Sequence, residues 1–189
     1  MDIFLHNLRF LIFEQLEGIY LYHIELVLVL SAIIAFLPCF IMVKRENRKF
    51  DAVLLYCTLA YLGMILLITI FRRDPGSRYG IVKTKLNFGA MESGFIQERQ
   101  VLYCILNVFL FMPYGFFIAL LRRSEPLLKA LCMSALTCFV TSMFIEVVQL
   151  ITGRGRFEVT DLVTNVIGGA AGAFLGLFLC FLVRKVKKK

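Results

Sequence analysis

The sequence predicts an all-α fold: a polytopic membrane helix bundle with about five transmembrane helices and a partly structured extracytoplasmic loop. The composition supports this class, because 60% of the 189 residues are hydrophobic and the mean hydropathy is +0.82. The polar residues of a soluble domain could not cover so much apolar surface. The apolar residues also gather in long runs, and the excess of Lys and Arg over Asp and Glu, 21 against 13, lies between and after these runs.

The apolar runs have the length of membrane-crossing helices. Four of them contain about 18 or more consecutive uncharged residues, enough to cross roughly 30 Å of hydrocarbon. A fifth run carries Lys129 near one end, where a lysine can extend its amine to the membrane surface, and Glu146 near the other. Helices are expected because open strands would leave backbone groups without hydrogen bonds in lipid. The sequence therefore predicts transmembrane helices over residues 24–43, 52–71, 101–121, 127–151 and 161–183.

Three segments surround or interrupt these helices, which together form a single domain of residues 20–183. Residues 1–19 carry charges loosely on one side of a helical wheel, so an interfacial amphipathic helix is expected there. Residues 72–100 form a loop longer than an ordinary connection, and their mixture of Gly, charged and amphipathic pieces fits either a lid over the helix ends or a solvated loop. Residues 184–189 are a basic tail.

The distribution of Lys and Arg predicts the orientation in the membrane. A cytoplasmic C-terminus places twelve basic and three acidic residues in the cytoplasm, a charge of +9, and leaves nine basic and ten acidic residues outside, a charge of −1. Cytoplasmic connections of membrane proteins are enriched in Lys and Arg. We therefore expect a cytoplasmic C-terminus and an extracytoplasmic N-terminus. The net charge of +8 then records orientation in a lipid bilayer, and no nucleic-acid partner is predicted.

The cysteines and histidines do not indicate metal or cofactor chemistry. The six cysteines lie in the apolar runs without a CxxC motif, as small packing residues do, and only two histidines occur. No Gly-rich phosphate-binding loop follows a predicted strand. We therefore expect no metal site and no cofactor.

Polar residues inside the predicted helices are the most informative signal for function. Glu146 and Gln149 lie one turn apart in the fourth predicted helix, and Asp161 and Asn165 one turn apart in the fifth. Asn107 lies in the third. At 1.5 Å per residue, Asn107 and Glu146 lie roughly 9 and 8 Å below the extracytoplasmic ends of their helices, and Asn165 roughly 6 Å below the start of the fifth. Buried carboxylates without partners are costly, so these groups are expected to be paired, protonated or exposed to a water-filled cavity.

Three arginines are expected at the same membrane face. Arg73, Arg154 and Arg156 follow the predicted helix ends there and can pair with the carboxylates. Such ion pairs and amides can simply hold helices together. Because polar groups of three helices converge at one depth, we instead favour a binding or catalytic site.

Small residues predict close packing of the helices that carry these polar groups. In the fifth predicted helix Gly168, Gly172 and Gly176 form a small-xxx-small ridge that lets a neighbouring backbone approach. In the third, Pro113 precedes Gly115 by two residues and can free a carbonyl group toward the same space.

Four motifs of the chain resemble a known family. They are FRRDPG at residues 71–76, Asn87 in KLNFGAM, Asn107 with Pro113 and Gly115 in NVFLFMPYG, and EVVQLITGRGRFEVTDLVTNVIGGAAG at residues 146–172. The last and most specific motif combines E-x-x-Q, a short Arg-rich loop, D-x-x-x-N and glycines at helical spacing. From about residue 72 to residue 176 the chain resembles the VanZ-like family of bacterial membrane proteins. One departure follows Asn87, where the family usually has an apolar residue and then Pro-Phe, but this chain has Phe-Gly-Ala-Met.

The resemblance implies a location, a function and a set of residues. It implies a bacterial plasma membrane and resistance to glycopeptide antibiotics, chiefly the lipoglycopeptides of the teicoplanin type, by a mechanism that it does not supply. The family pattern points to Arg73, Asn87, Asn107, Glu146, Gln149, Arg154 or Arg156, Asp161 and Asn165.

The leading hypothesis is a binding protein, in which these residues engage an amphipathic ligand in a polar cavity open to the outer leaflet. The ligand would be the lipoglycopeptide or the lipid-linked cell-wall precursor that it targets. One alternative is a membrane enzyme that uses Glu146 and Asp161 as general acid and base on a lipid-linked substrate. Another is a small proton-coupled transporter, although no inverted repeat is evident in the sequence.

Overall fold

The computed structural model describes residues 2–46, 48–76, 80–89 and 94–187. Six α-helices, one π-helical turn and two short strands form in this part of the chain. In chain order they are α1 (Asp2–Leu16), α2 (Leu21–Glu46), α3 (Lys49–Leu66), the π-helical turn η1 (Leu67–Phe71), β1 (Val82–Lys83), α4 (Gly94–Leu121), α5 (Leu127–Thr152), β2 (Phe157–Glu158) and α6 (Val159–Lys187).

Five of the described helices are long and apolar enough to cross a membrane. Their apolar spans have mean hydropathies between 1.9 and 2.9, and they comprise α2, α3 with η1, α4, α5 and α6. Among the described residues, strand structure is confined to two residues in each of β1 and β2. The predicted all-α polytopic bundle is therefore confirmed, and its architecture is that of a multi-pass membrane protein.

All five transmembrane helices extend beyond the expected bounds, and two of them do so by four residues or more at one end. α4 begins at Gly94, so residues 94–100, which were expected in the loop, form its first turns. α6 continues to Lys187, so the first four residues of the expected basic tail are helical. Both differences have one cause: an apolar run marks only the part of a helix that can lie in hydrocarbon, whereas the helix itself can continue with polar residues. The connection between η1 and α4 therefore covers residues 72–93.

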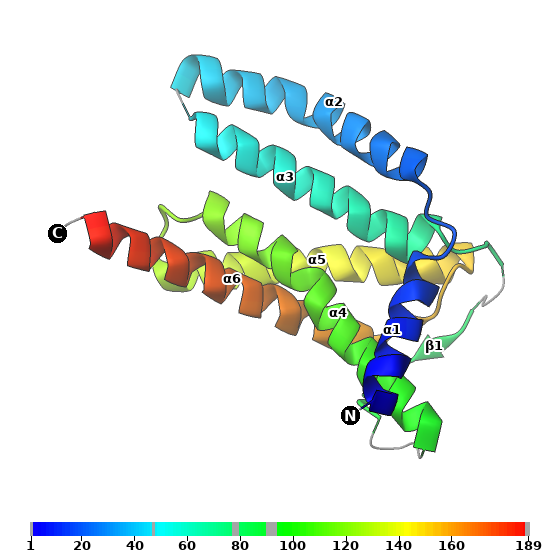
Figure 1. Cartoon of the computed structure of the whole chain (residues 1–189). Helices are drawn as coiled ribbons and strands as arrows, with labels where there is room; N and C mark the ends of the chain where they lie inside the picture. Colours follow the sequence, from blue (N-terminus) through cyan, green and yellow to red (C-terminus); the bar gives the residue numbers. More distant parts are fainter. Residues whose placement is uncertain (1, 47, 77–79, 90–93, 188–189) are drawn as a thin grey trace.

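Different segments of the chain lie at the two ends of the helix bundle (Figure 1). At one end, called here the N-terminal end, lie α1, β1 and the connection between α5 and α6. At the other, the C-terminal end, lie the α2–α3 turn, the α4–α5 turn and the last turns of α6. α6 packs along α4 and α5, α3 packs on α4, and α2 packs on α3. Of the five spans, α2 is the least buried within the protein.

Glycine residues bring α6 against the backbone of α4. A Cβ atom on Gly168 would overlap the carbonyl oxygen of Val108. Four residues later, a Cβ atom on Gly172 would overlap the carbonyl oxygen of Met112. A Cβ atom on Gly176 would lie 3.1 Å from another α4 carbonyl oxygen, a tight contact without overlap. Because these contacts repeat every four residues, the two backbones stay close over several helical turns.

The α4–α6 contact is reciprocal. Gly115 of α4 faces the backbone of Gly169 on α6, and Gly169 also packs against the side chain of Cys138 on α5. α4 continues through Pro113, and the hydroxyl of Tyr61 on α3 donates a 2.9 Å hydrogen bond to the carbonyl group three residues before this proline. α6 is thus held between α4 and α5, with α3 on the far side of α4.

Ion pairs close the C-terminal end of the bundle. Asp51, the third residue of α3, is only 5% exposed and pairs with Arg48 at 2.7 Å and with Arg123 from the α4–α5 turn. Arg184 of α6 donates a 2.7 Å hydrogen bond to the backbone carbonyl of Arg123. These contacts join α3, the α4–α5 turn and α6 at the end opposite to the N-terminus.

The glycine contacts predict unequal effects of added methyl groups along α6. Gly172→Ala would force a methyl group into the α4 backbone, and overpacking of this kind costs about 1–3 kcal/mol. Gly176→Ala places its methyl group 3.1 Å from the nearest oxygen and should cost much less. Thermal unfolding of the purified variants in detergent should therefore give a clearly lower Tm for Gly172→Ala than for Gly176→Ala. Equal Tm values would contradict the close backbone contact.

Candidate functional site

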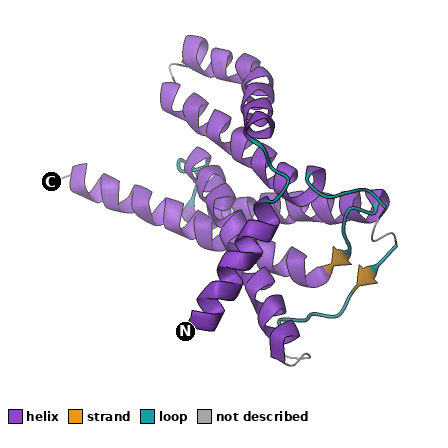
Figure 2. Ribbon diagram, turned by 45° about the vertical axis from the view of Figure 1, so that its right-hand side comes forward, coloured by secondary structure: helices purple, strands orange, loops and turns teal. Residues whose placement is uncertain are grey.

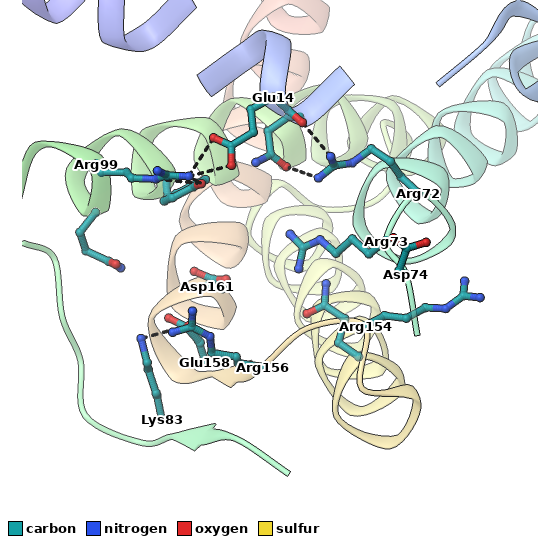
Figure 3. Close-up of a pocket in the computed structure, with 14 residues that line it drawn as sticks. Glu14, Arg72, Arg73, Asp74, Lys83, Arg99, Arg154, Arg156, Glu158 and Asp161 are labelled. Atoms are coloured by element: carbon teal, nitrogen blue, oxygen red, sulfur yellow. Dashed lines mark hydrogen bonds and ion pairs between the residues drawn. The ribbon is translucent and has the colours of Figure 1, made fainter. Parts of the chain in front are cut away.

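A polar pocket of about 600 Å³ lies at the N-terminal end of the bundle (Figure 3). Six basic and four acidic side chains contribute to its lining, together with one tyrosine and one glutamine from each of α1, α4 and α5. The lining residues are Glu14, Gln15, Arg72, Arg73, Asp74, Lys83, Arg99, Gln100, Tyr103, Gln149, Arg154, Arg156, Glu158 and Asp161. They come from α1, the residues that follow η1, β1, α4, α5, the connection after α5, β2 and the start of α6.

The π-helical turn η1 places two arginines at the pocket. The backbone N–H of Arg72 donates a 3.0 Å hydrogen bond to the carbonyl of Leu67, five residues earlier, so the helix widens just before it ends. The side chain of Gln149 on α5 donates a 2.9 Å hydrogen bond to the carbonyl of Thr69 inside this turn. The turn is thereby fixed to α5, and Arg72 and Arg73 follow it directly into the pocket.

The connection after α5 brings further polar groups to the same place. α5 is capped by Gly153 in the left-handed conformation, with φ at 65°. A Cβ atom on Gly155 would lie 2.9 Å from Oε1 of Gln149 and 3.0 Å from Nη1 of Arg73. Gly155 therefore leaves the space in which Gln149 and Arg73 reach the pocket side by side. Arg154, between the two glycines, donates a 3.3 Å hydrogen bond to a carbonyl of η1.

Glu146 organises the pocket wall from behind. Its side chain is only 2% exposed, and Oε2 accepts a 2.8 Å hydrogen bond from the backbone N–H of Glu158. A buried carboxyl group needs such partners because losing its hydration is costly. Glu146 was expected as a ligand-binding residue, but it does not line the pocket. It instead fixes β2 to α5.

The long loop is partly built into the pocket. β1 and β2 pair in parallel, with Val82 opposite Phe157 and Lys83 opposite Glu158 (Figure 2). Nζ of Lys83 lies 3.4 Å from a carboxylate oxygen of Glu158, and Nη1 of Arg156 lies 3.8 Å from the same oxygen. The described part of the loop is therefore attached to the α5–α6 connection, and Lys83 reaches the pocket lining from it.

Asp161 is the acidic residue that α6 contributes to the pocket. It is the third residue of this helix, and the side chain of Asn107 on α4 lies close to its carboxylate. Asn107 thus positions Asp161 without lining the pocket itself. Asn165, one turn deeper, also lies outside the lining, because its amide donates a 2.8 Å hydrogen bond to the hydroxyl of Ser142 on α5.

Asn87 has an anchoring contact in the loop. Its side-chain oxygen accepts a 2.9 Å hydrogen bond from the backbone N–H of Gly89, and its own backbone N–H donates to the hydroxyl of Thr160 at 2.9 Å. Gln100 donates a 3.2 Å hydrogen bond to the backbone carbonyl of Asn87. The residue connects the loop to α4 and α6 and lies outside the pocket lining.

The predicted residues therefore divide into two groups. The pocket is lined by Arg73, Gln149, Arg154, Arg156 and Asp161. The others, Asn87, Asn107, Glu146 and Asn165, lie in the wall behind it and connect the elements that form it. Both Arg154 and Arg156 reach the lining, and of the two Arg156 lies 3.8 Å from a carboxylate oxygen of Glu158, whereas Arg154 donates to a carbonyl of η1.

The wall formed by α1 was not expected from the sequence. Nη2 of Arg99 on α4 lies 2.7 and 2.8 Å from the two carboxylate oxygens of Glu14. Arg72 donates to the backbone carbonyl of Glu14 at 2.7 Å and to the side-chain oxygen of Gln15 at 3.1 Å. Leu11 of α1 is only 2% exposed, so this helix also packs against the protein through an apolar side chain. The expected helix at the start of the chain thus forms one side of the pocket. The charges on one side of its helical wheel were the only sequence signal for polar partners.

The arrangement suits noncovalent recognition of a polar group. Guanidinium and amide groups from several elements surround one open space, and carboxylates lie between them. In the part of the chain that the structure describes, no group of three or more His, Cys, Asp or Glu side chains is placed to hold a metal ion. The guanidinium, amide and carboxylate groups of the lining can recognise a ligand through hydrogen bonds and charge.

The Glu14–Arg99 pair predicts how firmly α1 is attached. Both side chains are about one-third exposed, and pairs of this kind contribute roughly 0.2–1 kcal/mol. Glu14→Gln should therefore speed hydrogen exchange of the α1 amides by up to about fivefold. Glu17→Gln, which changes an exposed carboxylate just after the same helix, is the matched control. Unchanged protection in Glu14→Gln would show that the pair does not hold α1.

Comparison with known proteins gives the family of the chain. The family model described as VanZ/LLP1 matches residues 26–182. No curated protein and no solved structure matches the chain. The matched residues contain all of the pocket except the two residues that α1 contributes, and they contain nearly all of the five apolar spans. The chain belongs to the VanZ/LLP1 family.

Proposed function

We propose that the protein confers resistance to glycopeptide antibiotics, chiefly lipoglycopeptides of the teicoplanin type, by binding an amphipathic ligand in the polar pocket. The ligand is the antibiotic itself or the lipid-linked cell-wall precursor that the antibiotic targets. The observation that carries this proposal is a charged pocket of about 600 Å³ at the end of five apolar helices. Membership of the VanZ/LLP1 family supports it.

The surface beside the pocket favours a ligand with an apolar part. Glu14 and Gln15 of α1 line the pocket, while Phe13 and Leu16 of the same helix are 73% and 48% exposed. A polar group in the pocket would therefore lie next to an apolar surface that continues into the membrane spans. An amphipathic molecule in the leaflet matches both surfaces.

The proposal places the N-terminal end of the bundle outside the cytoplasm. Lys and Arg exceed Asp and Glu in the connections at the C-terminal end, which is typical of the cytoplasmic side of bacterial plasma-membrane proteins. The pocket then opens at the outer leaflet, where a lipoglycopeptide and a lipid-linked precursor would both be met.

The position of Glu146 favours binding over catalysis. The enzyme alternative needs Glu146 and Asp161 to reach one substrate as acid and base. Glu146 instead accepts a hydrogen bond from the backbone of Glu158 and lies behind the pocket wall. Of these two residues, only Asp161 lines the pocket. We therefore propose a binding protein.

Removing pocket arginines should lower resistance. Arg73→Gln and Arg154→Gln each remove a charged donor, and a charge-assisted hydrogen bond contributes about 1.5–3 kcal/mol, roughly a tenfold or larger change in affinity. Cells that express either variant should therefore show a lower inhibitory concentration of a teicoplanin-type antibiotic than cells with the parent protein. Lys129→Gln is the matched control, because this exposed side chain lies at the C-terminal end. Full resistance in both arginine variants at normal membrane abundance would refute the proposed site.

The orientation predicts the behaviour of reporter fusions. A fluorescent protein joined to the C-terminus of the full chain should fluoresce, and alkaline phosphatase joined there should be inactive, because the C-terminus is expected in the cytoplasm. Alkaline phosphatase joined after Asp74, which follows two apolar spans, should be active. The reverse pattern would place the pocket on the cytoplasmic side.

A further inference from the structure

Cationic groups converge on the pocket from separate segments. Arg73 follows η1, and Arg154 and Arg156 lie in the connection between α5 and β2. Figure 3 shows Arg73 extending from the end of η1 across the pocket toward Asp161. Five of the six basic lining residues are arginines, whose planar guanidinium groups can donate two parallel hydrogen bonds to one oxyanion.

The lining carries more positive than negative charge. Two of the four lining carboxylates pair with basic side chains of the protein. Glu14 pairs with Arg99, and Glu158 lies close to both Lys83 and Arg156. The hydrogen bonds of Arg72 and Arg154, among the described residues, go to carbonyl and amide oxygens. These oxygens fix the two side chains without neutralising their charge. An anionic ligand group would complete the charge balance.

The pocket lies at the depth of lipid headgroups. Arg73 is the second residue after the apolar span of α3 and η1, and Arg154 is the second after the span of α5. Asp161 is the third residue of the α6 span. Side chains at the ends of membrane-crossing helices lie at the interface between hydrocarbon and water, where phosphate groups of lipids also lie.

We propose that the pocket binds the phosphate or diphosphate group of a lipid, through the guanidinium groups of Arg73, Arg154 and Arg156. Asp161 faces the same space and accepts a hydrogen bond from a hydroxyl or amino group next to that phosphate. This inference rests on the proposed function, since it names the part of the amphipathic ligand that the pocket recognises. The lipid-linked precursor is thereby favoured over the antibiotic.

Substitutions at Asp161 and at the arginines should change the affinity for pyrophosphate in opposite directions. A bare diphosphate brings no hydrogen-bond donor for this carboxylate and is repelled by it, so Asp161→Asn should bind inorganic pyrophosphate more tightly than the parent protein. Arg73→Gln and Arg154→Gln should each bind it less tightly, by about tenfold. A nonspecific loss of structure would weaken binding in all three variants.

The test is calorimetric titration of the purified full chain in an uncharged detergent. The probes are a polyprenyl diphosphate, the matching polyprenol without phosphate, and inorganic pyrophosphate, and Lys129→Gln serves as the control. We expect the lipid diphosphate to bind more tightly than pyrophosphate, the polyprenol not to bind at the pocket, and rising salt to weaken both phosphate ligands.

Three outcomes would overturn the inference. If the polyprenol bound as tightly as its diphosphate, recognition would not involve phosphate. If pyrophosphate bound as tightly as the lipid, the ligand would be free phosphate and not a lipid headgroup. If the arginine variants bound the lipid diphosphate like the parent, the site would lie elsewhere.

The test separates this inference from the proposed function. Loss of resistance in Arg73→Gln and Arg154→Gln without any phosphate binding would overturn the phosphate inference and retain the proposed resistance site. Phosphate binding that depends on these arginines, with resistance unchanged in the variants, would retain the inference and refute the proposed function.

Discussion

The close contact between the backbones of α4 and α6 is the constraint on which the pocket depends. Val108 meets Gly168 without an intervening side chain, so the two backbones lie in close contact. Asn107, the neighbour of Val108, then reaches Asp161 two turns before Gly168. If larger residues separated the helices, Asn107 would move away from the carboxylate at the start of α6.

Two buried polar side chains at the pocket wall, those of Glu146 and Gln149, have hydrogen-bond partners inside the protein. The carboxyl group of Glu146 accepts the backbone N–H of Glu158, and the amide of Gln149 donates to the carbonyl of Thr69. A buried polar group without a partner would cost more than these hydrogen bonds contribute. Residues of this kind therefore set the shape of the pocket, while the charged side chains in front of them remain able to meet a ligand.

The sequence predicted the helices and the level of the site because both follow from local patterns. Apolar runs determine where a chain can cross a membrane, and helical rise per residue places Glu146 and Asn107 at a common depth. The same patterns could not show that Glu146 faces the backbone of β2, because that contact depends on how the α5–α6 connection folds. Nor could they show the widened turn η1, which arises where the end of α3 packs against α5.

The attachment of α1 depends on a contact between residues far apart in the chain, which the sequence alone could not predict. Glu14 and Arg99 are 85 residues apart, and nothing local in either segment selects the other. Their ion pair is partly exposed, so salt and competing anions act on it more strongly than on the buried hydrogen bond of Glu146. The ion pair of α1 is thus reached by water, although Leu11 of the same helix is buried, whereas Glu146 in the opposite wall is almost fully buried. A ligand that enters the pocket would therefore meet a firm wall on α5 and α6 and a yielding wall on α1.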